Sequence, residues 1–305
     1  MKAHERAEAW RLRRLLRAGF VVASFAAIVL LLWSQGDAIT AAARRFDGEA
    51  AVLALGAALG HVLMSYWAWR VLRPGGSERL SARQARSLFF LSQVGKYLPG
   101  GIWQFIAAAE LGKEAGIGRR ETMASFVFAL VAAIAAGATL AIARLAEQLD
   151  QSGLGPWWFA AALLPLAVLL FPPMARLIAR VAGIARVPPP RTLAVSALLA
   201  IGTWFFAGAM LASLASALGY DGSVSSIVLY SAYYAAAWIA GFLVLIAPAG
   251  IGAREGVLIA LLSAQMPLAE AALVALMARI FVTIVDLGAA AFVLAFNRPP
   301  AAREA

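Results

Sequence analysis

Two short polar segments interrupt the long apolar runs of this sequence. The first, QVGKYLPGGIWQF, spans residues 93–105 and carries Lys96; the second, APAGIGAREG, spans residues 247–256 and carries Arg254 and Glu255. A charge at the centre of a bilayer costs about 2.5 to 3.5 kcal/mol on insertion scales, so it is rarely kept without a use or a partner. The chemistry that these residue types suggest is anion binding, and a phosphate would be a natural ligand.

Each segment also contains residues that break a helix. Proline removes a backbone donor and clashes with the preceding turn, while adjacent glycines permit a tight reversal. We therefore expect a new helix to begin near Ile102 and another near Ala253, each with free N–H groups and a partial positive charge that favours anions. The residues that shape the two breaks are Pro99, Gly100, Gly101, Pro248, Gly250 and Gly252.

The candidate substrate-binding residues all lie in these two segments. Lys96 and Arg254 would supply positive charge, and Glu255 would neutralise one of them or titrate to couple transport to protons. The alternatives are structural: Lys96 could extend from a shallow tip to the membrane surface, and Arg254 with Glu255 could form a purely structural ion pair. The full candidate set is Lys96, Tyr97, Trp103, Gln104, Arg254 and Glu255, in which Trp103 and Gln104 could line the site or pack beside it.

Further polar residues occur in other apolar runs. Arg279 and Asp286 are seven residues apart, hence on one helix face, and are candidates for an internal ion pair. His61 is expected to hydrogen-bond between helices. Tyr230 and Tyr234 belong to an aromatic row at helical spacing, which is more often packing than a lipid or sugar contact.

The composition defines the elements that must position these residues. Of 305 residues, 63% are apolar and 14% are charged, against roughly one quarter charged in soluble domains. Runs of about 20 apolar residues can cross a hydrocarbon core of about 30 Å, and none shows the alternation of a membrane barrel. The net charge of +10 comes mainly from arginines in short loops, which indicates membrane topology and not nucleic-acid binding. Without cysteine, and with only His4 and His61, we expect no metal site and no cofactor.

The predicted fold is all-α and polytopic, with about six to eight transmembrane helices plus two broken or re-entrant hairpins in an inverted-repeat arrangement. Residues 1–16 form a basic cytoplasmic arm, residues 17–296 a single transmembrane domain, and residues 297–305 a cytoplasmic tail. The predicted apolar runs are 17–34, 50–71, 87–109, 122–143, 156–173, 192–218, 225–247, 252–264 and 269–296.

The basic residues on either side of residues 87–109 predict the path of this segment through the membrane. The connections before and after this run are both basic, so it should enter from the cytoplasm and return to it. The stretch 225–264 should then begin and end outside, although 225–247 alone is long enough to span. Paired broken segments in opposite orientation point to a transporter's binding site. Both termini should lie on the cytoplasmic side of the inner membrane.

The two breaks also carry a family resemblance. KYLPGGIW and PAGIGAREG resemble the paired motifs of the lysylphosphatidylglycerol synthase transmembrane-region family, also called flippase-like membrane proteins, over roughly residues 10–297. The resemblance implies lipid movement between leaflets, in pathways of aminoacylated phospholipids, glycolipids, hopanoids or surface polysaccharides. No aminoacyl-transferase domain follows within this chain, so we expect no synthase activity. The helix TMASFVFALVAAIAAG, residues 122–137, lacks the ionisable residues that family members often place there.

We therefore predict a non-enzymatic inner-membrane flippase that moves an anionic phospholipid or a polyprenyl-phosphate-linked glycolipid. One alternative is a polyprenyl-phosphate-dependent glycosyltransferase, whose carboxylates would be Asp37, Asp47 and Glu49. Another is a non-transporting partner of a lipid or polysaccharide biosynthetic enzyme. The expected partners are the bilayer, an anionic lipid or lipid-linked saccharide, and either a second copy of the chain or such an enzyme, but no nucleic acid.

Overall fold

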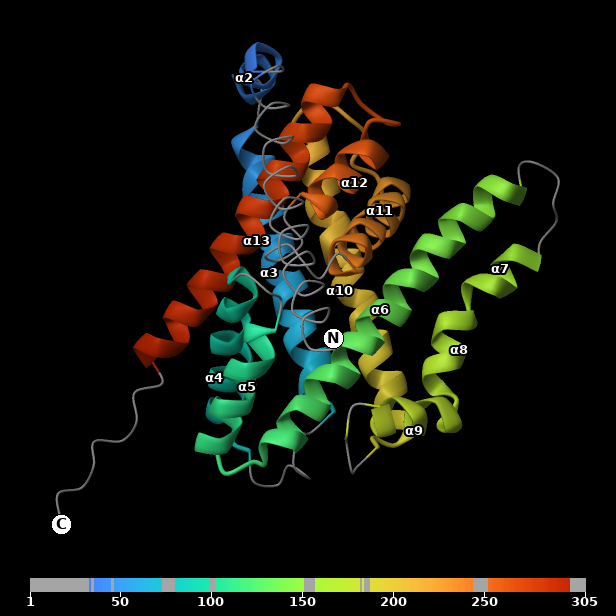
Figure 1. The fold of residues 1–305 in the computed structure, drawn as a ribbon. Helices are drawn as coiled ribbons and strands as arrows, with labels where there is room; N and C mark the ends of the chain where they lie inside the picture. Colours follow the sequence, from blue (N-terminus) through green and yellow to red (C-terminus); the bar gives the residue numbers. More distant parts are fainter. Residues whose placement is uncertain are drawn as a thin grey trace, which may run out of the picture.

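The structure is a computed structural model. It describes residues 33, 36–44, 47–72, 80–98, 102–150, 157–181, 183, 187–243 and 252–296. All elements within these ranges are helical (Figure 1), as the prediction of an all-α class requires. In chain order they are α2 (Gly36–Arg44), α3 (Gly48–Arg70), α4 (Ala82–Gln93), the 3-10 turn η2 (Val94–Tyr97), α5 (Trp103–Glu114), α6 (Arg119–Asp150), α7 (Trp157–Ala162), α8 (Leu164–Leu170), α9 (Pro172–Val181), α10 (Pro190–Ser216), α11 (Val224–Leu243), α12 (Ala253–Leu262) and α13 (Leu268–Phe296).

Five of these helices, α3, α6, α10, α11 and α13, are long and apolar enough to cross a membrane, and a bent α8–α9 pair would make a sixth. The protein is therefore a multi-pass membrane protein, as predicted. The predicted first span, residues 17–34, lies almost wholly outside the described residues. The predicted runs 50–71, 122–143, 192–218, 225–247 and 269–296 all coincide with these long helices.

Helix α3 shows how local sequence sets a helix start. The side chain of Asp47 accepts a hydrogen bond from the backbone N–H of Glu49 at 3.1 Å, which satisfies one of the free donors of the first turn. Glu49 in the first turn and Arg70 in the last turn both suit the helix dipole. Asp47, one of the carboxylates considered for a glycosyltransferase, therefore has a structural role.

The centre of the bundle is α10, which packs against α3, α6 and α11. Small residues permit the close contact with α11: a Cβ on Gly208 would lie 2.4 Å from the carbonyl oxygen of Ile227. Close approach through small residues is the usual basis of helix packing in membranes, where lipid tails remove the hydrophobic drive. The core of α3, α10, α11 and α13 is correspondingly rich in fully buried alanine.

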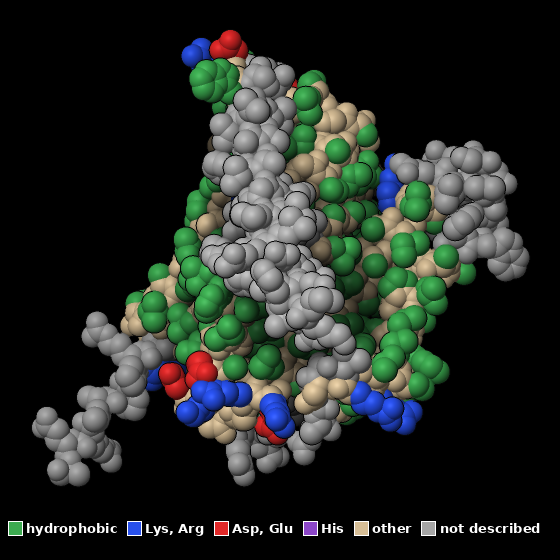
Figure 2. All heavy atoms as spheres, in the orientation of Figure 1, with side chains coloured by type: hydrophobic (Ala, Val, Ile, Leu, Met, Phe, Trp, Pro, Cys, Tyr) green, Lys and Arg blue, Asp and Glu red, His purple; other side chains and the backbone are tan. Residues whose placement is uncertain are grey.

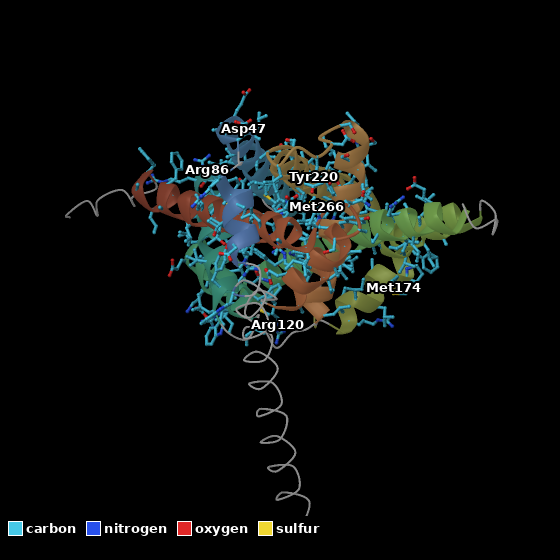
Figure 3. The ribbon with its side chains drawn as sticks, turned by 90° about the horizontal axis from the view of Figure 1, so that it is seen from above. Asp47, Arg86, Arg120, Met174, Tyr220 and Met266 are labelled. Atoms are coloured by element: carbon cyan, nitrogen blue, oxygen red, sulfur yellow. The ribbon has the colours of Figure 1, made fainter. Side chains whose placement is uncertain are left out.

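Helices α6 to α9 form an arm that extends to one side of this bundle, as the two views in Figures 1 and 3 agree. The predicted single run 156–173 is interrupted here. Pro165 at the start of α8 cannot donate to the preceding turn, and Pro172 and Pro173 end that helix. The chain turns by 59° between residues 160–170 and 172–180.

Two further regions contain helices too short to span. Helices α4 and α5 have 12 residues each, about 18 Å of helix, and lie side by side in Figure 1. A capping box between Ser81 and Gln84 starts α4. Helix α12 has ten residues and packs on α11. These two hairpins, α4–η2–α5 and α11–α12, contain the breaks predicted from the sequence.

The turn between α10 and α11 is stabilised by Asp221. Its carboxylate accepts hydrogen bonds from the backbone and hydroxyl of Ser223 and from the hydroxyl of Ser226, and these bonds lower the pKa of Asp221. A lowered pKa stabilises the folded state above the ordinary value of about 3.9, and this contribution is lost as the pH falls through the lowered pKa.

We therefore expect Asp221→Ala to unfold at a lower temperature than the wild type at pH 7. The difference should shrink as the pH falls below about 4, because protonation then favours the unfolded chain, and it should vanish below the lowered pKa of the folded protein. Thermal unfolding of both proteins in detergent between pH 3 and pH 8 measures this. A difference that is the same at every pH would show that ionisation of Asp221 is not the cause.

Candidate functional site

A polar cluster lies at the middle of the membrane-spanning helices. His61 is near the centre of α3, Thr203 is at the centre of α10, and Tyr234 is at the centre of α11. On α13, Arg279 and Asp286 lie about one turn to either side of the midpoint. Since α3, α10 and α13 are each long and apolar enough to cross a membrane, their midpoints put this cluster near the middle of the hydrocarbon, where polar groups are most costly.

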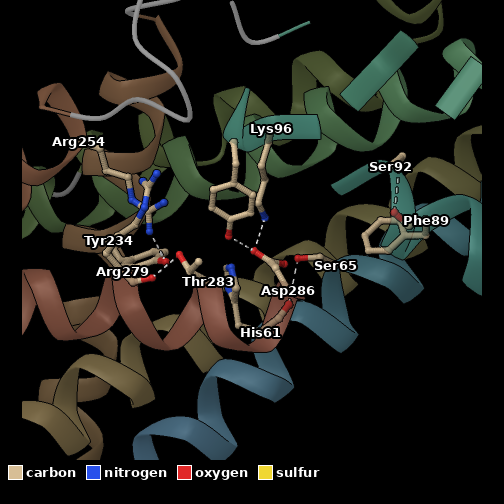
Figure 4. A network of polar contacts seen from close by, with 11 residues as sticks. His61, Ser65, Phe89, Ser92, Lys96, Tyr234, Arg254, Arg279, Thr283 and Asp286 are labelled. Atoms are coloured by element: carbon tan, nitrogen blue, oxygen red, sulfur yellow. Dashed lines mark hydrogen bonds and ion pairs between the residues drawn. The ribbon is translucent and has the colours of Figure 1, made fainter. Parts of the chain in front are cut away.

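The first break joins this cluster through Asp286. Lys96 Nζ lies 2.6 Å from Asp286 Oδ2, and the hydroxyl of Tyr97 donates to the same oxygen at 2.6 Å (Figure 4). Asp286 is only 2% exposed, whereas the Lys96 side chain is 27% exposed. The buried carboxylate thus has both a counter-charge and a hydrogen-bond donor, and the turn η2 is bound to α13.

The second break joins through Glu255. Its Oε1 lies 3.1 Å from Arg279 Nη1, and its Oε2 accepts the backbone N–H of Gly252 at 2.9 Å. Gly252 has a φ of 95°, a left-handed conformation that favours glycine. Glu255 therefore both caps its own helix and connects α12 to α13.

Arg254 has a different environment. Its guanidinium donates to the hydroxyl of Tyr234, and its Cζ lies 4.6 Å from the centroid of that ring, within cation–π range. Tyr234 in turn packs edge-on against His61, with ring centroids 5.7 Å apart. His61 Nδ1 lies 3.0 Å from the carbonyl oxygen of Thr203, which confirms the predicted hydrogen bond between helices.

The predicted pair between Arg279 and Asp286 is corrected by these contacts. Seven residues along one helix correspond to about 10.5 Å, which is far for a direct ion pair. The structure instead gives Asp286 a partner in the first break and Arg279 a partner in the second. Helix α13 therefore binds both hairpins, through two charges that lie about two turns apart.

Comparison with known protein families identifies the family of this chain. The chain fits the family model described as the lysylphosphatidylglycerol synthase transmembrane region over residues 18–290. The chain belongs to this family. No curated protein matches it.

In this member of the lysylphosphatidylglycerol synthase transmembrane-region family, three predicted residues contact α13: Lys96, Tyr97 and Glu255. The fourth, Arg254, contacts Tyr234 of α11. Trp103 begins α5 with 43% exposure, and Gln104 follows it, half-buried. Of the residues that were predicted to shape the breaks, Gly252 starts α12, whereas Pro99, Gly100, Gly101, Pro248 and Gly250 lie outside the described residues. Helices α5 and α12 begin where the sequence predicted.

Two glycines of this family member allow close contact within the two hairpins. Neither was predicted from the sequence as a functional residue. A Cβ on Gly95 would lie 2.6 Å from the backbone nitrogen of Gln104, at the start of α5. A Cβ on Gly241 would lie 2.7 Å from Cβ of Arg254, at the start of α12. In each hairpin, a glycine on the first arm thus contacts the beginning of the helix after the break. Their only sequence signal is their position, 9 residues before Gln104 and 13 residues before Arg254.

We expect Gly95→Ala to lower the free energy of unfolding by about 1 to 3 kcal/mol, since the methyl group would overlap backbone atoms that cannot rotate away. Gly56→Ala on α3 is the matched control, because a Cβ there meets no atom within 4 Å. Denaturant unfolding in mixed micelles measures both. Equal stability of the two variants would show that the hairpin can open at Gly95 without cost.

Proposed function

We propose that this protein moves lipids with an anionic headgroup between the leaflets of a bacterial-type inner membrane. The observation that carries the proposal is the charged cluster at mid-depth, built by both breaks and by α3, α10, α11 and α13. The barrier to lipid flipping is the transfer of a polar headgroup through hydrocarbon. A polar group fixed at mid-depth lowers that barrier. Because a charged side chain at this depth is costly, its presence indicates a functional site.

The short hairpins support a pathway for the headgroup. Helices α4 and α5 are each about half the length needed to cross the hydrocarbon, so the hairpin α4–η2–α5 enters from one face and returns to it. Helix α12 likewise returns along α11 from its break. The two hairpins then insert from opposite faces, as inverted repeats of transporters do, with both breaks meeting at the site. Irregular backbone at this depth is tolerated where it is buried or lines a wet cavity.

The orientation follows from the basic residues. On the face seen in Figure 2, the described side chains above the lower rim are mainly hydrophobic, and Lys and Arg side chains lie along that rim together with some Asp and Glu. Lys113 lies in the last turn of α5, Arg119 and Arg120 begin α6, and Arg176 and Arg180 lie in α9. By the positive-inside rule this rim faces the cytoplasm, and the hairpin α4–η2–α5 enters from that side.

The proposal assigns no bond-making chemistry to this chain. The cluster residues bind each other and a headgroup, and Asp47 is accounted for by its capping of α3. The expected partner is the lipid itself within the bilayer, moved between leaflets without covalent change.

The test is translocation by the purified chain in proteoliposomes. Phosphatidylglycerol with a fluorophore on one tail is placed in both leaflets, and a membrane-impermeant reductant quenches the outer one. We expect wild-type protein to expose the inner-leaflet pool faster than protein-free vesicles do, and phosphatidylglycerol to move faster than phosphatidylcholine. Rates equal to those of protein-free vesicles for every anionic lipid tried would overturn the proposed function.

A further inference from the structure

The charges of the central cluster do not balance. Lys96, Arg254 and Arg279 are positive, whereas Glu255 and Asp286 are negative. With His61 neutral, the described part of the cluster therefore carries one excess positive charge. A net charge at mid-depth is costly, since low dielectric penalises any ion that has no counter-ion.

The excess is located at Arg254. Asp286 is matched by Lys96, and Glu255 is matched by Arg279. Among the described residues, Arg254 bonds only a neutral partner, the hydroxyl and ring face of Tyr234. A tyrosine orients a guanidinium without neutralising it, so Arg254 remains a cation that is held in place.

A second cation lies close to this position. Arg279 pairs with Glu255, the direct chain neighbour of Arg254, and both guanidinium groups are near enough to Tyr234 to act on its hydroxyl electrostatically. Figure 4 shows the side chains of Arg254 and Arg279 extending into the same region between α12 and α13. Converging guanidinium groups with forked donors suit a phosphate oxygen pair.

We propose that the site takes a headgroup bearing a single negative charge, a phosphodiester, in preference to headgroups with two or more. This inference deepens the proposed function and rests on it for the claim that the ligand is carried across. One negative charge brings the cluster to neutrality. A phosphomonoester dianion would leave one excess negative charge, at a cost similar to that of the empty site, and a diphosphate with more than two charges would leave a larger excess. Lys96 is then a structural cation that compensates Asp286, and Arg254 is the residue that determines charge specificity.

The test is ligand binding, measured by the shift in the unfolding temperature of the detergent-solubilised full chain. The probes are short-chain phosphatidylglycerol, diacylglycerol diphosphate and phosphatidylcholine with identical tails, together with glycerol phosphate and inorganic phosphate. We expect phosphatidylglycerol to bind at least about tenfold more tightly than the other two lipids, a difference of about 1.4 kcal/mol. Weaker binding of glycerol phosphate and inorganic phosphate would identify the lipid as the ligand; equal binding would identify a free phosphate.

Two charge variants make the test decisive. Asp286→Asn and Glu255→Gln each raise the excess to two positive charges while keeping the side-chain shape. We expect each to reverse the order, so that the diphosphate lipid binds more tightly than phosphatidylglycerol. Either variant suffices if the other does not fold. Tighter or equal binding of the diphosphate lipid by the wild type, or an unchanged order in the variants, would overturn the inference. Selective binding without translocation would instead overturn the proposed function and leave the inference standing.

Discussion

Replacing Arg279 with leucine should lower the free energy of unfolding by about 3 to 5 kcal/mol, the typical cost of removing one partner of a buried ion pair. The Glu255 side chain is only 11% exposed, and without Arg279 its carboxylate loses the cation 3.1 Å away. The hairpin α11–α12 also loses its ion pair to α13. Denaturant unfolding in mixed micelles measures the loss.

The control is Arg120→Leu, since Arg120 lies exposed at the start of α6 and should change stability by less than about 0.5 kcal/mol. The double variant Arg279→Leu with Glu255→Gln should recover part of the loss, because the neutral amide oxygen can still cap α12 without an unpaired charge. If the double variant is less stable than Arg279→Leu alone, the unpaired charge is not the cause.

Replacing Arg254 with glutamine should lower the rate of phosphatidylglycerol translocation by about ten- to hundredfold. The variant removes a charge-assisted hydrogen bond worth about 1.5 to 3 kcal/mol where the headgroup crosses the membrane, and each 1.4 kcal/mol corresponds to a factor of ten. The unfolding temperature should change little, because Arg254 has only the neutral Tyr234 as a described partner. The proteoliposome assay described above measures the rate.

Arg120→Gln is the matched control for this variant and should keep the wild-type rate. Arg254→Lys should recover part of the rate, since it restores the charge without the forked donors. A glutamine variant that folds normally and translocates at the wild-type rate would remove Arg254 from the headgroup path.

The long helices could be predicted because membrane spans are set by a local property, the length of apolar sequence. The two breaks could be predicted for a related reason, since Pro99 with its glycines and Pro248 with its glycines are local signals, and Lys96 and Arg254 are charges in apolar surroundings. The start of α12 at Ala253 confirms this reasoning.

Pairing across the bundle could not be predicted. Lys96 and Asp286 are 190 positions apart, and no spacing rule connects them. Arg279 and Asp286 share a helix face, which suggested an ion pair between them. Along the helix axis they are about 10.5 Å apart, whereas each has an oppositely charged partner from one of the two breaks within 3.1 Å. Tyr234 shares its spacing with aromatic residues that simply pack, so its bond to Arg254 had no signal of its own.

The most direct measurement of the central claim is an electron cryomicroscopy map of the full chain in nanodiscs of phosphatidylglycerol. A phosphate bound at mid-depth predicts headgroup density within about 4 Å of the Arg254 guanidinium, the distance of an ion pair, near the midpoint of α13. Headgroup density confined to the two membrane surfaces, with Arg254 turned to a protein carboxylate, would contradict the account.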